Sequence, residues 1–341
     1  MMKLNFFGHS LIAILLFLIV GLNSGCSQNS NNQDIKSLSI EELTKRIEND
    51  PKNVELLTQR AKIYEQNGSY NEALIDVSKI IEIEPKKIEH YIYLSDLFFK
   101  DGQLKNTVGA LNRGLAIDPN HIEANLKMGE IFLFYKKYPD VFKHVNLVLD
   151  IDPRNPKAFF MRGYTYKELG DTARAVQNYL EAVKNDPKHA LAYMELGIIF
   201  GAKNNPIAID YYKNSIAADS TDMNSYYNLG MYYQTHEMLN EAIDIYTRMG
   251  KIDPKYPYSF YNLGYLYLEI LKVPDEAVKQ FSAAIEAKPD YVEAYFNRGL
   301  AFEQLGNVYR AKEDYQKALQ LRTNYPNAIE ALNRIDNIIN R

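Results

Sequence analysis

The chain has 341 residues, a formal net charge of −4 at pH 7, 12% aromatic residues and one cysteine. One cysteine cannot form a disulfide bond within the chain. A slightly acidic sequence without a run of lysine and arginine lacks the charge pattern of nucleic-acid-binding proteins. Composition therefore disfavours a disulfide framework and a nucleic-acid partner.

Residues 1–25 have the features of an export signal. Lys3 supplies a positive charge, residues 11–20 form an apolar run, and two small residues precede Cys26. The run is too short for a permanent membrane span. The segment resembles a bacterial lipoprotein signal, which implies that Cys26 carries acyl chains such as palmitate and becomes the mature N-terminus. Asn23 stands where that family usually has leucine, so cleavage nearby that leaves Cys26 a free thiol is the alternative.

Residues 26–37 contain almost no apolar side chains and are expected to be a flexible tether. Ser27, not Asp, follows the cysteine. By resemblance to enteric lipoproteins, this implies delivery to the outer membrane. The tether has no acidic run of the kind associated with surface export, so we expect the protein to face the periplasm, anchored to the membrane through its lipid.

The first helix is expected within residues 38–53. Ser39 is a plausible N-cap, and Asp50-Pro51 ends the helix because proline cannot continue it. We interpret this segment as a half repeat that covers the exposed end of the first full unit.

From residue 54 to residue 325 the chain repeats a unit of two amphipathic helices joined by a polar turn. Five prolines follow one another at steps of 34 residues, and two more continue the series at steps of 67 and 35: Pro51, Pro85, Pro119, Pro153, Pro187, Pro254 and Pro289. Glycines keep nearly the same step: Gly129, Gly163, Gly197, Gly230, Gly264 and Gly299. Both series lose one residue near 202–206 and gain one near 271–274, which places both length changes between helices, where they are tolerated.

Glycine inside a helix costs about 1 kcal/mol relative to alanine, so these glycines need a packing reason. An alanine follows five of them one helix later, for example Ala175 after Gly163, and Val141 takes its place after Gly129. We therefore expect glycine and alanine to face each other and let the two backbones approach closely.

Residues 226–230, 261–264 and 296–299 carry an aromatic residue, asparagine, then leucine or arginine, and glycine. With the later alanine, aromatic residue and proline, this pattern resembles the tetratricopeptide repeat (TPR) family. The resemblance implies an all-α fold, a right-handed superhelical solenoid of eight TPR helical hairpins with an N-terminal half repeat and a C-terminal capping helix. The expected repeats are 54–87, 88–121, 122–155, 156–189, 190–222, 223–256, 257–291 and 292–325. Residues 326–341 are the expected cap, since they carry an apolar face at Ile329, Leu332, Ile335, Ile338 and Ile339.

No arrangement of side chains in the sequence indicates catalysis. Five histidines follow the signal, at His90, His121, His144, His189 and His236, without the HExxH spacing and with no cysteine to complete a metal site. The aspartates that precede prolines read as helix ends. We therefore expect no enzyme activity, no cofactor and no metal.

In the TPR family, partners bind on the concave face, which is lined by fixed places of each first helix. From the fourth repeat onward, the fifth and ninth places are aromatic or aliphatic, and three successive repeats have asparagine at the sixth. The candidate binding groove consists of Phe160, Tyr164, Met194, Ile198, Tyr227, Asn228, Met231, Tyr261, Asn262, Tyr265, Phe296, Asn297 and Leu300. Two interpretations stay open: these side chains pack against one another along the inner wall, or they anchor a segment of another protein whose backbone the asparagines bind.

A carboxylate clamp of lysines is not indicated, because the lysines of the first helices are scattered and faced by glutamates. The sequence thus predicts a lipid-anchored envelope adaptor for other proteins or peptides. By resemblance to other TPR lipoproteins, its clients are peptidoglycan enzymes, secretion or pilus components, or outer-membrane assembly machinery. The alternatives are a self-associating structural protein, whose groove holds the tail or terminal helix of another copy, and, remotely, an enzyme.

Overall fold

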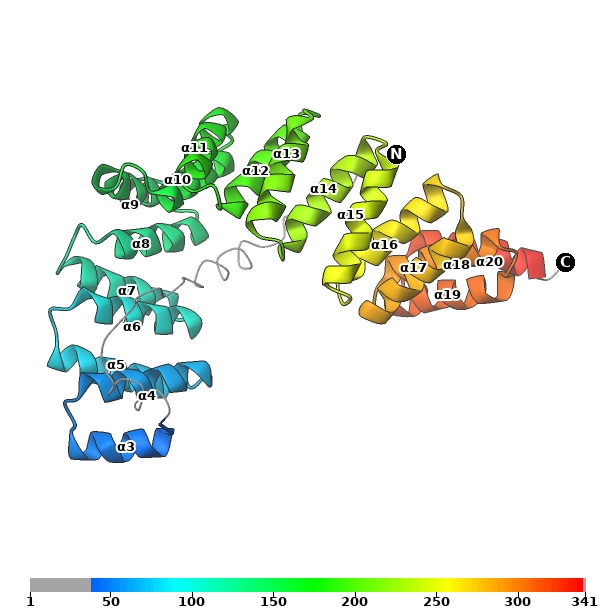
Figure 1. The fold of residues 1–341 in the computed structure, drawn as a ribbon. Helices are drawn as coiled ribbons and strands as arrows, with labels where there is room; N and C mark the ends of the chain where they lie inside the picture. The colour runs from blue at the N-terminus through cyan, green and yellow to red at the C-terminus, as the bar shows by residue number, and fades with distance from the viewer. Residues whose placement is uncertain (1–37, 340–341) are drawn as a thin grey trace. The chain divides into compact units, whose positions relative to one another are not determined.

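A computed structural model describes residues 38–339, and the signal and the whole tether, including Cys26, lie outside this range. Within it the chain is helical, without a strand, which confirms the all-α prediction (Figure 1). The helices are α3 (Ile40–Asn49), α4 (Val54–Gln66), α5 (Tyr70–Ile83), α6 (Ile88–Lys100), α7 (Leu104–Leu115), α8 (Ile122–Phe134), α9 (Tyr138–Ile151), α10 (Pro156–Glu168), α11 (Thr172–Asn185), α12 (Ala190–Gly201), α13 (Ile207–Ala218), α14 (Met223–Thr235), α15 (Leu239–Ile252), α16 (Pro257–Tyr265), the π-helix η1 (Leu266–Ile270), α17 (Pro274–Ala287), α18 (Val292–Gln304), α19 (Val308–Leu321) and α20 (Pro326–Ile339).

From α4 to α19 the helices pack as consecutive pairs, and we call the members of each pair the first and the second helix. The chain divides into two compact units, which we call unit 1 (up to Asn185) and unit 2 (from Asp186). Unit 1 contains α3 to α11 and unit 2 contains α12 to α20. Each unit is described by itself below.

Side-chain caps start several of these helices. At α3 the Ser39 Oγ accepts a hydrogen bond from the Glu42 amide at 3.2 Å, and the Glu42 Oε2 accepts one from the Ser39 amide at 2.8 Å. This reciprocal pair satisfies two backbone donors that have no partner inside the helix. The half-repeat helix therefore begins at the residue that the sequence indicated.

The mid-helix glycines make room for aromatic rings. A Cβ atom on Gly163, Gly197, Gly230, Gly264 or Gly299 would lie 2.5–2.9 Å from the ring of a tyrosine or phenylalanine of the second helix, and these are Tyr179, Tyr212, Tyr246, Phe281 and Tyr315 in turn. The expected close approach of glycine to alanine is found at Gly163 and Gly299, where the Cβ would lie 3.2 Å from the backbone oxygen of Ala175 or Ala311. At all five glycines the aromatic ring is the nearer neighbour, which the alanine pattern did not predict.

The fifth repeat is one residue short and the seventh is one residue long, and the structure accommodates these two changes in different ways. The residue missing from the fifth repeat shortens the α12–α13 hairpin, whose helices have 12 residues each. The residue added to the seventh repeat lies inside the first helix, because η1 widens its last turn and the Leu271 amide reaches back five residues to the Leu266 carbonyl at 2.9 Å. The predicted place of the insertion, between the helices, is therefore wrong: a π-turn absorbs the extra residue.

The C-terminal helix α20 caps unit 2 with a narrower face than expected. Ala328, Ala331 and Ile335 are buried against α19 and its neighbours, whereas Ile329 and Ile338 are 43% and 48% exposed. The prediction that both isoleucines belong to the buried face is wrong, because the small alanines allow close packing on the adjacent stripe.

Three arginines at one place of the repeat join the helices around them. Arg298 of α18 binds both oxygens of Asp314 in α19 at 2.8 Å and Ser282 of α17 at 3.0 Å. Arg60 makes the corresponding contacts with Asp76 and Thr44, and Arg162 makes them with Asn178 and Asn146. Each arginine thus fixes its own hairpin to the second helix before it.

Candidate functional site

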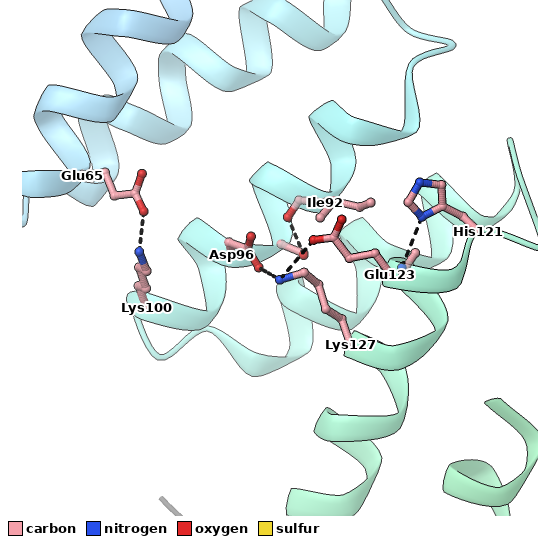
Figure 2. Close-up of polar contacts among 9 residues, drawn as sticks. Glu65, Ile92, Asp96, Lys100, His121, Glu123 and Lys127 are labelled. Atoms are coloured by element: carbon pink, nitrogen blue, oxygen red, sulfur yellow. Dashed lines mark hydrogen bonds and ion pairs between the residues drawn. The ribbon is translucent and has the colours of Figure 1, made fainter. Parts of the chain in front are cut away.

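Successive first helices of unit 1 are joined by polar contacts, which Figure 2 shows. Lys100 of α6 pairs with Glu65 of α4 at 2.5 Å, and the Tyr93 hydroxyl donates to the same carboxylate at 2.9 Å. Lys127 of α8 pairs with Asp96 of α6 at 2.6 Å. We call the surface formed by the first helices of a unit its first-helix wall. In unit 1 this wall is charged.

Burial affects the carboxylates of this wall. It raises the pKa of Asp96 above the ordinary value, although Lys127 works in the opposite direction. It also raises the pKa of Glu130, which lies one repeat further along on α8. Desolvation disfavours the charged form of an acid. The wall of unit 1 therefore holds carboxylates that water stabilises only in part.

The two groove candidates in unit 1 belong to the hydrophobic core. Phe160 and Tyr164 are 5% and 7% exposed. The Phe160 ring lies 5.7 Å from the ring of Tyr179 in the second helix and 6.4 Å from that of Tyr164. In this unit the side chains pack against their own repeat.

The first-helix wall of unit 2 carries an aromatic row, which we define as Tyr227, Tyr258, Tyr261 and Tyr291. The ring centroids of Tyr227 and Tyr258 are 6.4 Å apart, those of Tyr258 and Tyr291 5.8 Å, and those of Tyr261 and Tyr291 4.9 Å. Burial raises the pKa of the Tyr227, Tyr261 and Tyr291 phenols. The row is thus a packed, partly desolvated layer.

The three asparagines at the sixth place have different environments. The Asn297 side chain donates to the Tyr261 hydroxyl at 2.9 Å, and Asn228 is half-buried. Asn262 is buried, and its Nδ2 has no acceptor within residues 38–339. The asparagines therefore do not form a uniform row of donors.

The other groove candidates of unit 2 differ in exposure. Met194 is buried, while Ile198, Met231 and Leu300 are half-buried. Phe296 is half-buried, with its ring 5.6 Å from that of Tyr315 and 5.3 Å from that of Tyr325. Tyr265, at 38%, is the one groove candidate that is exposed.

Residues 38–339 contain no group of three or more His, Cys, Asp or Glu side chains that could hold a metal ion. His144 is 8% exposed, and its Nδ1 lies 2.8 Å from Asn125 Oδ1. Burial lowers the pKa of His144. This histidine belongs to the core of unit 1.

We expect the contribution of His144 to the stability of unit 1 to be lost as the pH falls. Because the pKa of His144 is lowered by folding, the unfolded chain takes up the proton first. The contribution of His144 is complete above the ordinary histidine pKa of about 6.5 and is lost as the pH falls from there through the lowered value. Urea unfolding at several pH values should show a smaller loss for His144→Gln than for the wild type. Equal losses would contradict this account.

Comparison with known proteins identifies the repeats. Models described as "TPR repeat" or "Tetratricopeptide repeat" match residues 54–87, 160–222, 275–306 and 292–325. The chain belongs to the tetratricopeptide-repeat family. A solved structure of the C-terminal part of a TPR repeat-containing protein from Cytophaga hutchinsonii is similar to the TPR chain described here. It has a TM-score of 0.58 and 19% identity, covering 71% of this chain and 99% of that one, and this likeness concerns the fold.

Two curated relatives contain similar repeats. The human protein O-mannosyl-transferase TMTC3 is 26% identical over 161 residues, which cover 43% of the TPR chain and 18% of that protein. The RNA polymerase II-associated protein 3 of Xenopus laevis is 34% identical over 113 residues, which cover 33% and 16%. The TPR chain thus matches less than a fifth of the length of either relative.

Proposed function

We propose that this TPR protein is an adaptor whose first-helix wall in unit 2 holds a segment of another protein. The observation that carries the proposal is Tyr265, an exposed aromatic side chain on α16 beside the packed aromatic row. Aromatic residues are enriched among the side chains that dominate binding energy, and Met231, half-buried on α14, offers an adaptable contact. The packed row would support Tyr265 as a rigid base.

The proposal includes a place in the cell. The apolar run before Cys26 and the polar tether after it support a lipid anchor at Cys26 and a position on the periplasmic side of the outer membrane. Among residues 38–339, no helix combines the length and apolar composition that a membrane span requires. We propose peptidoglycan enzymes, secretion or pilus components, or outer-membrane assembly machinery as the clients.

Enzyme activity is not part of the proposal. TMTC3 is named as a transferase, but the matched region is 18% of its length. Family membership supports an interaction role, since repeat proteins of this kind present extended surfaces to partners.

The proposal is tested by comparing two tyrosine substitutions. Tyr265→Ser removes the exposed aromatic from the first-helix wall, and Tyr309→Ser removes one that is 68% exposed on the second helix α19. We expect Tyr265→Ser to reduce recovery of co-purifying proteins from native cells at least tenfold, as loss of an interface anchor worth about 1.4 kcal/mol or more would do. Tyr309→Ser should leave recovery unchanged. If the two variants retain the same partners in the same amounts, the wall is not the binding surface.

Self-association is a second candidate function, which the exposed Ile329 and Ile338 of α20 favour. It predicts dimers whose fraction grows with concentration in analytical ultracentrifugation and falls in an Ile329→Ser/Ile338→Ser variant. Helix α20 stays in place in that variant because its buried alanines and Ile335 are untouched. A monomer at all concentrations would reject this candidate.

A further inference from the structure

One carboxylate on the first-helix wall of unit 1 lacks the partner that its counterpart has. Asp96 stands at the ninth place of α6 and is paired with Lys127 of the next first helix at 2.6 Å (Figure 2). Glu130 stands at the same place of α8, 34 residues later. It is half-buried and forms no hydrogen bond or ion pair with the rest of residues 38–339.

The reason can be read from the repeat itself. Moving on 34 residues from Lys127 leads to Met161, which is 3% exposed on α10. In the repeat of Asp96, the ammonium group comes from Lys127. At the equivalent place for Glu130, the chain has the Met161 thioether. The repeat that would neutralise Glu130 supplies an apolar side chain instead.

The cations of unit 1 nearest to Glu130 do not replace that ammonium group. Lys127 is engaged with Asp96 and lies 3.9 Å from Glu123, and Lys157 is exposed, one turn before Met161. Both lower the pKa of Glu130, but burial outweighs them and raises it. A carboxylate that loses water without gaining a partner destabilises the folded chain.

We propose that the first-helix wall of unit 1 binds a protein segment by itself and that the Glu130 carboxylate receives a lysine or arginine side chain from that segment. The inference rests on the proposed function as an adaptor, and it concerns unit 1 alone. The incoming cation takes the place that the Lys127 ammonium takes at Asp96. Binding would then supply the ion pair that folding leaves unmade, so the partner segment is one with a basic residue at a fixed position.

The test uses random peptides displayed on phage, selected on the purified full chain. Peptides selected by the wild type should share a lysine or arginine at one position and bind Glu130→Gln at least tenfold more weakly. Glu130→Lys should select aspartate or glutamate at that position. The matched control is Glu123→Gln, which removes a carboxylate that is 61% exposed on the same helix and should leave the selection unchanged.

Two results would overturn the inference in different ways. Peptides that bind without a basic residue, or equally well to Glu130→Gln, would show that the wall binds segments but that Glu130 has no part in it. If the wild type selects no peptide, the proposed function fails as well.

A measurement without ligand gives an independent check. Glu130→Gln removes the unpaired charge, and Met161→Lys supplies the missing cation from within the chain. Glu130→Gln should raise the midpoint of thermal unfolding by about 2–4 °C. Met161→Lys should abolish the preference for basic peptides. A lower midpoint for Glu130→Gln would mean that the carboxylate already has a stabilising partner, and the inference would be wrong.

Discussion

Replacing Asp314 by alanine should destabilise unit 2 by about 3–5 kcal/mol, the usual cost of removing one partner of a buried ion pair. The side chains of Arg298 and Asp314 are 21% and 8% exposed, and the guanidinium binds both carboxylate oxygens. The hydrogen bond from Asp314 raises the pKa of Arg298. The arginine nevertheless stays charged when this partner is lost, because a guanidinium is not deprotonated in proteins. The variant thus leaves a largely buried cation with Ser282 as its remaining hydrogen-bond partner.

Hydrogen exchange measured by mass spectrometry should show faster exchange in α18 and α19 of the Asp314→Ala variant. The control is the double variant Arg298→Leu/Asp314→Ala, since leucine stands at the corresponding place in the two preceding repeats, as Leu229 and Leu263. We expect the double variant to lose less stability than the single one, because no unpaired charge is left. A larger loss in the double variant would contradict this explanation.

Replacing Gly230 by alanine should destabilise unit 2, although alanine is the better helix former. The new Cβ would lie 2.5 Å from Tyr246 Cε1 and 2.9 Å from Cζ, and this ring is completely buried, so the tyrosine has no room to move. Adding a methyl group to a tightly packed core costs about 1–3 kcal/mol. Removing the glycine from a helix returns up to about 1 kcal/mol.

The matched control is Gly109→Ala in α7, where a new Cβ would meet no atom within 4 Å. This variant should gain stability of about 0.5–1 kcal/mol. The difference between the two variants in urea unfolding isolates the steric effect. Equal changes in stability would mean that the glycine is not needed for the tyrosine.

The sequence predicts the helical hairpins well because their signals are local. Proline ends a helix through its own ring, and the reciprocal cap at Ser39 requires only Glu42 three residues later. Residue counting cannot distinguish a longer connection from a wider helical turn, so the π-turn at Leu266–Ile270 was missed.

The exposure of the candidate site could not be predicted because it depends on neighbouring repeats. Tyr261 occupies a first-helix place that suggests a groove, but Tyr291 at the end of its repeat packs against its ring and Asn297 of the following repeat donates to its hydroxyl. The place of a residue within its own repeat does not show these contacts. Tyr265 stays exposed on the same helix.

The unpaired Glu130 can be recognised in the sequence when successive repeats are compared. The acid at residue 96 has a lysine, Lys127, at the facing place of the next first helix. The equivalent acid, Glu130, has Met161 at that place. Reading charges as pairs across repeats would have found it. The ion pair between Lys127 and Asp96 at 2.6 Å shows that these two places of successive repeats are in contact.

We propose that the first-helix wall of unit 2 binds another protein. Site-specific photo-crosslinking in native cells tests this binding most directly. A photoreactive amino acid replaces Tyr265 on the wall, and a control probe replaces Lys279, whose side chain is 67% exposed on the second helix α17. The account predicts that Tyr265, and not Lys279, captures one specific foreign protein, identified by mass spectrometry. Capture of the same proteins from both positions, or of none from Tyr265, would contradict it.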